Sequence, residues 1–195
     1  MFLGIPSSQY PVDNWVLQEI IYEIKPRFII ETGTYMGGTS LFCALILEQV
    51  KNNGEVITID VKNQHAEAAK LETWRRCVDF ILGDSVSDEV ISKVAEKVEN
   101  QRVLVFLDSS HSKEHVLKEL RCYSPFVSLG SYMIVNDTSY GGNPIPGPPD
   151  ETVTKEGAHE AVLEFLKEND NFIIDHSREK HLVTQNKNGY LKRIK

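Results

Sequence analysis

The feature that most constrains the fold is the alternation of short apolar segments with segments that carry a helical pattern. Five runs are almost wholly apolar and are expected to form strands: residues 28–30, 56–60, 79–82, 103–108 and 132–137. Strands that are apolar throughout, without alternation, are typical of parallel sheets covered by helices on both faces. The sequence therefore predicts an α/β fold with a three-layer, doubly wound, Rossmann-like sheet, mostly parallel and joined by right-handed crossovers.

Segments with helical spacing lie between these runs. Val90, Val94 and Val98, for example, share one helical face. Helices are expected at residues 12–24, 39–51, 66–73, 88–98, 113–123 and 157–168. Two late strands are expected at 171–175 and 182–185, and the late part of the sheet is expected to be antiparallel.

The chain shows no internal repeat, and residues 1–195 are expected to form a single domain. One long stretch, residues 139–155, is rich in Gly and Pro and begins beside Tyr140. A long irregular loop within a compact domain is often functional, so this stretch is a candidate active-site lid.

Charge and composition exclude several classes of partner. The net charge of −7, from 28 acids against 21 bases, disfavours nucleic acid and anionic membrane surfaces. No apolar run approaches the ~20 residues of a membrane span. The three cysteines (Cys43, Cys77 and Cys122) form no zinc pattern and suggest buried thiols in a reducing, cytoplasmic setting.

A polar side chain comes at or just after the end of each expected early strand. These side chains are Glu31, Asp60, Asp84, Asp108 and the pair Asn136-Asp137. Ligands bind outside the carboxyl ends of the strands in such sheets, so the acids should gather at one edge. Asp and Asn after a strand also cap helices or begin turns, and that interpretation stays open for each residue alone.

The glycine-rich turn after Glu31 indicates a nucleotide-like ligand. Gly33 and Gly37-Gly38 let a ligand approach the backbone at a helix N-terminus, but the spacing matches neither G-x-G-x-x-G nor a Walker loop. Glu31 would repel a pyrophosphate, whereas the cationic cofactor S-adenosyl-L-methionine (SAM) suits a carboxylate. Asp60 is placed to bind the ribose hydroxyls, and Asp84 to accept from the adenine amine. Other candidate cofactor-binding residues are Thr34, Tyr35, Thr39, Ser40, Ser85 and Asp108.

A second group of candidates follows the fourth and fifth strands. Two carboxylates and an amide oxygen, from Asp108, Asn136 and Asp137, suit Mg²⁺ or another divalent cation. His111 lies three residues beyond Asp108 and is a candidate general base, although it could instead cap the next helix. His115 is expected to be structural or to support this group. Acyl transfer by a serine is disfavoured, because no G-x-S-x-G motif is present.

Taken together, these motifs resemble the cephalosporin hydroxylase and rhamnosyl O-methyltransferase family. The resemblance is carried by Pro11-Val12-Asp13, Ile29-Ile30-Glu31-Thr32-Gly33-Thr34, Gly83-Asp84-Ser85, Val103 to His111, Asn136-Asp137-Thr138 and Gly189-Tyr190-Leu191. It implies a class I, SAM- and Mg²⁺-dependent O-methyltransferase. It places Glu31 and the Gly33 loop at the methionine part of the cofactor, and Gly38 within that loop. Asn136 departs from the family, where an acid is expected, so the metal site loses one negative charge.

The function expected from these features is the transfer of a methyl group from SAM to a hydroxyl group. The expected acceptor is a vicinal diol on a small molecule or a sugar-containing natural product. Asp108 and His111 are the expected catalytic residues, and Gln9 and Tyr10 are expected to wall the cofactor or acceptor. Two alternatives stay open: an NAD(P)-dependent oxidoreductase, and a module that binds SAM without turnover. The oligomeric state is also open, with a homodimer among the possibilities.

Overall fold

The fold is seen in a computed structural model, which describes residues 1–51, 53–140 and 156–195. The candidate lid at 139–155 therefore lies almost entirely outside the described residues. In the described part of the chain, no helix has both the length and the hydrophobicity needed to cross a membrane.

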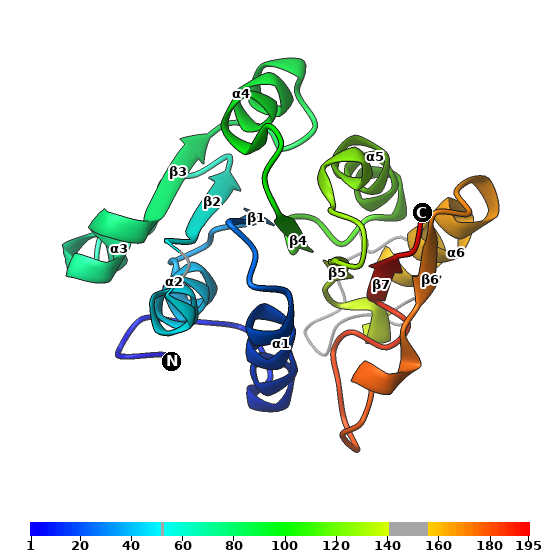
Figure 1. Ribbon diagram of the computed structural model, residues 1–195, viewed down its shortest axis with the longest axis horizontal. Helices are drawn as coiled ribbons and strands as arrows, with labels where there is room; N and C mark the ends of the chain where they lie inside the picture. Colours follow the sequence, from blue (N-terminus) through cyan, green and yellow to red (C-terminus); the bar gives the residue numbers. More distant parts are fainter. Residues whose placement is uncertain (52, 141–155) are drawn as a thin grey trace.

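Seven strands form one sheet, with helices on both of its faces (Figure 1). The strands are β1 (Phe28–Thr32), β2 (Glu55–Asp60), β3 (Val78–Leu82), β4 (Val103–Leu107), β5 (Tyr132–Val135), β6 (Phe172–Ile174) and β7 (Tyr190–Arg193). The α-helices are α1 (Pro11–Ile24), α2 (Gly38–Val50), α3 (Glu72–Cys77), α4 (Asp88–Val98), α5 (Lys113–Tyr123) and α6 (Ala158–Glu168). Short 3₁₀ turns include η1 (Ala68–Lys70) and η3 (Thr138–Tyr140).

The strand order is β3-β2-β1-β4-β5-β7-β6. Strands β1 to β5 pair in parallel, and β7 runs antiparallel to both of its neighbours, β5 and β6. The predicted three-layer, mostly parallel sheet with a late antiparallel strand is confirmed. Between β1 and β4 the order reverses direction, and open α/β sheets bind ligands outside the strand ends at such a switch point.

Alternate residues of the central strands enter two separate cores. Ile30 packs in the core beneath α4, α5 and α6, whereas its neighbour Ile29 packs in the core beneath α1 and α2. Both side chains are completely buried, and each such side chain stabilises the fold by roughly 1.5–3 kcal/mol. Burial on both faces explains why these strands lack polar alternation.

Two expected elements differ in the structure. Residues 182–185 are not a strand; Asp13 of α1 instead accepts hydrogen bonds from the Thr184 hydroxyl at 2.5 Å and the Gln185 backbone N–H at 2.8 Å. The late antiparallel strand is β7. The helix expected at 66–73 is interrupted at Leu71, whose extended backbone (ψ 140°) separates η1 from α3.

Candidate active site

A cleft opens at the carboxyl ends of β1 to β5. It consists of two cavities, of about 130 Å³ and about 370 Å³, which share Gly33, Asp60, Val61 and Ser109 in their walls and are therefore neighbours. Most of the residues predicted to bind a cofactor line one or both: Gly33, Thr34, Tyr35, Gly38, Thr39, Asp60, Asp84, Ser85 and Asp108. Glu31 and Ser40 are absent from both walls.

Two glycines, Gly33 in the β1–α2 loop and Gly38 at the first position of α2, permit close backbone contacts around the larger cavity. Gly33 has a φ of +87°, and a Cβ there would lie 2.0 Å from the backbone oxygen of Asp108. At Gly38, a Cβ would lie 2.2 Å from the backbone oxygen of Pro6. Any side chain at either position would therefore push the loop away from β4 or from the N-terminal segment.

Glu31 lies beneath this loop and is 2% exposed. Its Oε2 accepts hydrogen bonds from the Ser40 hydroxyl and, at 2.5 Å, from the Thr58 hydroxyl. Burial raises the pKa of Glu31 to about 7, although the two hydrogen bonds oppose the rise. Glu31 and Ser40 thus support the loop from below.

Asp60 and Asp84 make turn contacts and also line the cleft. The Asp60 carboxylate accepts from the backbone N–H of Tyr35 and of Lys62, both at 2.9 Å. Asp84 is exposed and accepts from the Val86 backbone N–H at 3.1 Å. The turn interpretation is correct for both residues, but carboxylate oxygens have further lone pairs for a ligand.

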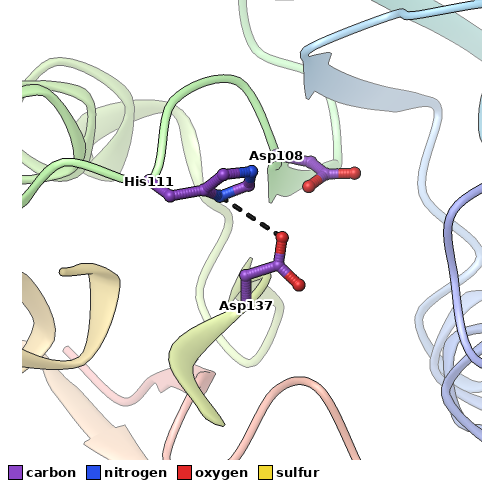
Figure 2. A group of neighbouring side chains, drawn as sticks. All are labelled: Asp108, His111 and Asp137. Atoms are coloured by element: carbon purple, nitrogen blue, oxygen red, sulfur yellow. Dashed lines mark ion pairs between the residues drawn. The ribbon is translucent and has the colours of Figure 1, made fainter. Parts of the chain in front are cut away.

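Asp108, His111 and Asp137 converge at the β4 and β5 ends (Figure 2), where one ligand atom from each lies within 4.8 Å of the others. His111 Nδ1 is 3.3 Å from Asp137 Oδ2. Burial raises the pKa of Asp108 well above its ordinary value, and the nearby charge of Asp137 adds to the rise. Burial also raises the pKa of Asp137, while His111 opposes the rise. Two carboxylates held this close disfavour each other's ionised form.

Asn136 is buried beside Asp108. Its Nδ2 donates to Asp108 Oδ1 at 2.7 Å, while its own Oδ1 is buried without a hydrogen-bond partner in the described residues. A buried oxygen without a partner costs roughly 1–3 kcal/mol, so a cation ligand there would relieve a real penalty. Two carboxylates and this amide oxygen are a donor set that fits a hard divalent cation.

Three supporting residues are brought to the site, of which only Gln9 was anticipated. Gln9 Nε2 donates to Asp108 Oδ2 at 2.8 Å. Gln185 Nε2 donates to Asp137 Oδ1 at 3.2 Å, and its Oε1 accepts from the Tyr10 backbone N–H at 2.7 Å. Glu119 of α5 is fully buried next to Ser85. Of the other two, Glu119 has a signal in the sequence, because it follows His115 by one helical turn, whereas Gln185 has none.

Comparison with solved structures shows the same fold in O-methyltransferases. An apo-structure of CmcI superposes with a TM-score of 0.72 at 18% identity, covering 100% of this chain and 76% of that one. A structure of CmcI with Mg and SAM gives 0.71 at 18% identity over the same shares. An O-methyltransferase from Bacillus cereus in complex with S-adenosylhomocysteine (SAH) gives 0.64 at 15% identity, over 98% and 85%.

Sequence comparison finds relatives with a named activity. The chain is 33% identical over 156 residues to rhamnosyl O-methyltransferases of Mycobacterium tuberculosis and Mycobacterium bovis, and 28% identical over 148 residues to that of Mycobacterium leprae. These matches cover about three quarters of this chain but span 62% of the length of the relatives. The family model described as Rhamnosyl O-methyltransferase/CmcI matches residues 1–194. With a match across almost its whole length, the chain belongs to the Rhamnosyl O-methyltransferase/CmcI family.

Proposed function

We propose that this chain is a SAM-dependent, divalent-metal-assisted O-methyltransferase that acts on a sugar or small-molecule hydroxyl, with residues 1–195 as one methyltransferase domain. The observation that carries the proposal is the convergence of Asp108, His111 and Asp137 on the wall of the 370 Å³ cavity, which the Gly33 loop also lines. A cofactor cleft and a cation-binding donor set are therefore contiguous. The rhamnosyl O-methyltransferases of the family support a sugar acceptor.

The cofactor is assigned to the two neighbouring cavities. Asp60 borders both and binds the ribose hydroxyls, so the methionine part lies toward Thr34 and Thr39. The adenine then occupies the 130 Å³ cavity beside Asp84 and Ser85. Glu31 holds the loop through Ser40, and a cationic sulfonium or amino group bound above it would favour the ionised form of the Glu31 carboxyl.

The acceptor is assigned to the β4–β5 end of the cleft. A divalent cation held by Asp108, Asn136 and Asp137 would lower the pKa of an acceptor hydroxyl and fix its orientation. His111 removes the hydroxyl proton, and Asp137 beside Nδ1 stabilises the imidazolium that results. An oxygen–carbon bond forms as the sulfur–carbon bond of SAM breaks, which leaves SAH. Gln9 and Gln185 restrain the two carboxylates in the meantime.

Calorimetry with SAH and with NADH, each with and without Mg²⁺, separates the proposed function from an oxidoreductase. We expect SAH to bind and NADH not to bind. A methyl-transfer assay with SAM, against rhamnosides, other vicinal diols and catechols, then separates an enzyme from a non-catalytic SAM-binding module. Binding of NADH without SAH, or SAH binding without transfer to any acceptor, would overturn the proposal in favour of the matching alternative.

A further inference from the structure

One of the residues that line the 130 Å³ cavity is a histidine paired with a buried carboxylate, and the proposed mechanism uses neither. His115 of α5 lines this cavity together with Asp84 and Ser85 of the β3–α4 loop. Glu119, one helical turn further along α5, lies behind them and is 0% exposed. A carboxylate that is fully buried needs hydrogen-bond or charged partners to offset the loss of solvation. The contacts of Glu119 therefore show which groups it holds in place.

Glu119 joins the two loops that bound the cavity. Its Oε1 accepts from the Ser85 hydroxyl at 2.6 Å and from the Ser109 hydroxyl at 2.7 Å. His115 Nε2 is 3.4 Å from the same oxygen. Oε2 of Glu119 is buried and has no hydrogen-bond partner in the described residues. All of its observed contacts thus face the loops after β3 and β4 and the His115 ring.

The hydrogen bonds fix which ring nitrogen of His115 remains available. The Ser85 hydroxyl gives its hydrogen to Glu119, so at 3.1 Å from Nε2 it can only accept one. Nε2 therefore carries a hydrogen and points to Ser85 and Glu119. The other ring nitrogen, Nδ1, makes no hydrogen bond within the described part of the chain, and it is left for a ligand in the cavity.

The charges around the ring favour the doubly protonated imidazolium. Hydrogen bonding to Glu119 raises the pKa of His115, with Glu119 and Asp84 adding favourable charge, while burial and Lys118 oppose the rise. Ser85, Ser109 and Ser110 complete the surroundings and are neutral. In this form Nδ1–H is a donor, whereas Asp84 is an acceptor a short distance along the same cavity wall.

Adenine presents the complementary pair on one edge: an exocyclic amine that donates, and flanking ring nitrogens that accept. We propose that His115, positioned by Glu119, is a specificity-determining residue that donates from Nδ1 to N1 or N7 of adenine while Asp84 accepts from the amine. This inference rests on the proposed function, because it takes the 130 Å³ cavity as the nucleoside site. It adds a donor from α5 to the acceptor expected from the β3–α4 loop.

The test measures binding of SAH and of three analogues in which N1, N7 or N3 of adenine is replaced by C–H. Calorimetry is done at one pH on the full chain, its His115→Leu variant and a His176→Leu control. The exposed His176 pairs with Glu179 beyond β6 and lines neither cavity. We expect the wild-type chain and the control to bind either the N1 or the N7 analogue about tenfold more weakly than SAH, and the N3 analogue like SAH.

In His115→Leu, we expect SAH itself to bind about tenfold more weakly than it binds the wild-type chain. The analogue that binds the wild-type chain weakly, with N1 or N7 replaced, should bind this variant with the same affinity as SAH. His115→Leu removes the imidazole beside the buried Glu119 carboxylate. The double variant His115→Leu/Glu119→Gln therefore repeats the test with a neutral amide in place of that carboxylate. This inference alone would be overturned if the analogues lost the same affinity relative to SAH in the wild-type chain and in the variants, or if no analogue lost affinity in any of them. Failure of the wild-type chain to bind SAH would overturn the proposed function and this inference with it.

Discussion

The two halves of the cleft treat their carboxylates differently. At the ends of β1 and β2, Glu31 and Asp60 each accept two hydrogen bonds from hydroxyls or backbone N–H groups. At the ends of β4 and β5, Asp108 and Asp137 lie close to each other, and their mutual charge contributes to the raised pKa of Asp108. The carboxylates of the first half are held by hydroxyl and backbone donors, whereas the two acids of the second half repel each other and would be balanced by a bound cation.

This difference between the two halves of the cleft indicates a different kind of ligand for each half. A preformed, internally hydrogen-bonded wall can take a ligand without rearrangement, which lowers the cost of ordering it. A crowded pair of acids is destabilising until a cation arrives, so binding there stabilises the fold as well as the ligand. Gln9, Asn136 and Gln185 donate amide hydrogens to the two acids and offset only part of this repulsion.

The largest effect is expected from Asp108→Asn, which removes one acid of the crowded pair. Methyl transfer should fall roughly 10³-fold or more, because a metal ion supplies several kcal/mol of charge stabilisation. Stability without Mg²⁺ should stay equal or rise, and the increase in melting temperature on adding Mg²⁺ should disappear. Asp170→Asn, at an exposed acid paired with Lys195, is the matched control. A retained Mg²⁺-dependent shift in Asp108→Asn would show that the cation is held elsewhere.

His111→Ala should give the next largest effect, a loss on the order of 10²- to 10³-fold in turnover, as expected for a general base. SAH affinity and the Mg²⁺-dependent stabilisation should change little, since both acids remain. Turnover and calorimetry on the same preparation check this, with His176→Ala as control. If His111 instead serves as a cation ligand, Mg²⁺ affinity will fall together with turnover.

Glu31→Gln probes the half at the ends of β1 and β2 through stability. The pKa of Glu31 is about 7 in the folded chain against an ordinary 4.5, so the folded state binds more protons between these values. Its contribution to the free energy of unfolding is therefore lost as pH rises from about 4.5 to 7, by on the order of 3 kcal/mol. Urea unfolding from pH 4 to 8 should show a smaller decline in Glu31→Gln than in wild type. Parallel profiles for the two proteins would contradict the raised pKa.

Much of this cleft could be predicted from the sequence, because parallel strands bring their carboxyl ends to one edge whatever the loops do. Apolar runs fixed the strands, and the acids that follow them had to gather there. Asp60, Asp108 and Asp137 reach the cleft for that reason. The side-chain partners of those acids could not be predicted in this way, since they depend on tertiary contacts.

Gln185 is the clearest example of what the sequence did not reveal. The apolar Leu182-Val183 just before it suggested a strand, yet both side chains are exposed. Hydrogen bonds from Thr184 and Gln185 to the buried Asp13 hold this segment against α1 instead, across more than 170 residues of chain. Neither strand propensity nor periodicity contains information about such a contact.

Asp60→Asn should give the smallest effect and isolates the nucleoside side of the comparison. The amide retains one acceptor oxygen, so it can replace either the contact to Tyr35 or that to Lys62, and the ribose loses at least one strong acceptor. SAH affinity should fall about tenfold, and removal of the ribose 2′-hydroxyl from SAH should weaken binding to wild type but not to the variant. The Mg²⁺-dependent shift in melting temperature should be unchanged, because Asp108 and Asp137 are untouched. Loss of that shift in Asp60→Asn would mean that the two halves are energetically coupled, and the contrast drawn between them would then be wrong.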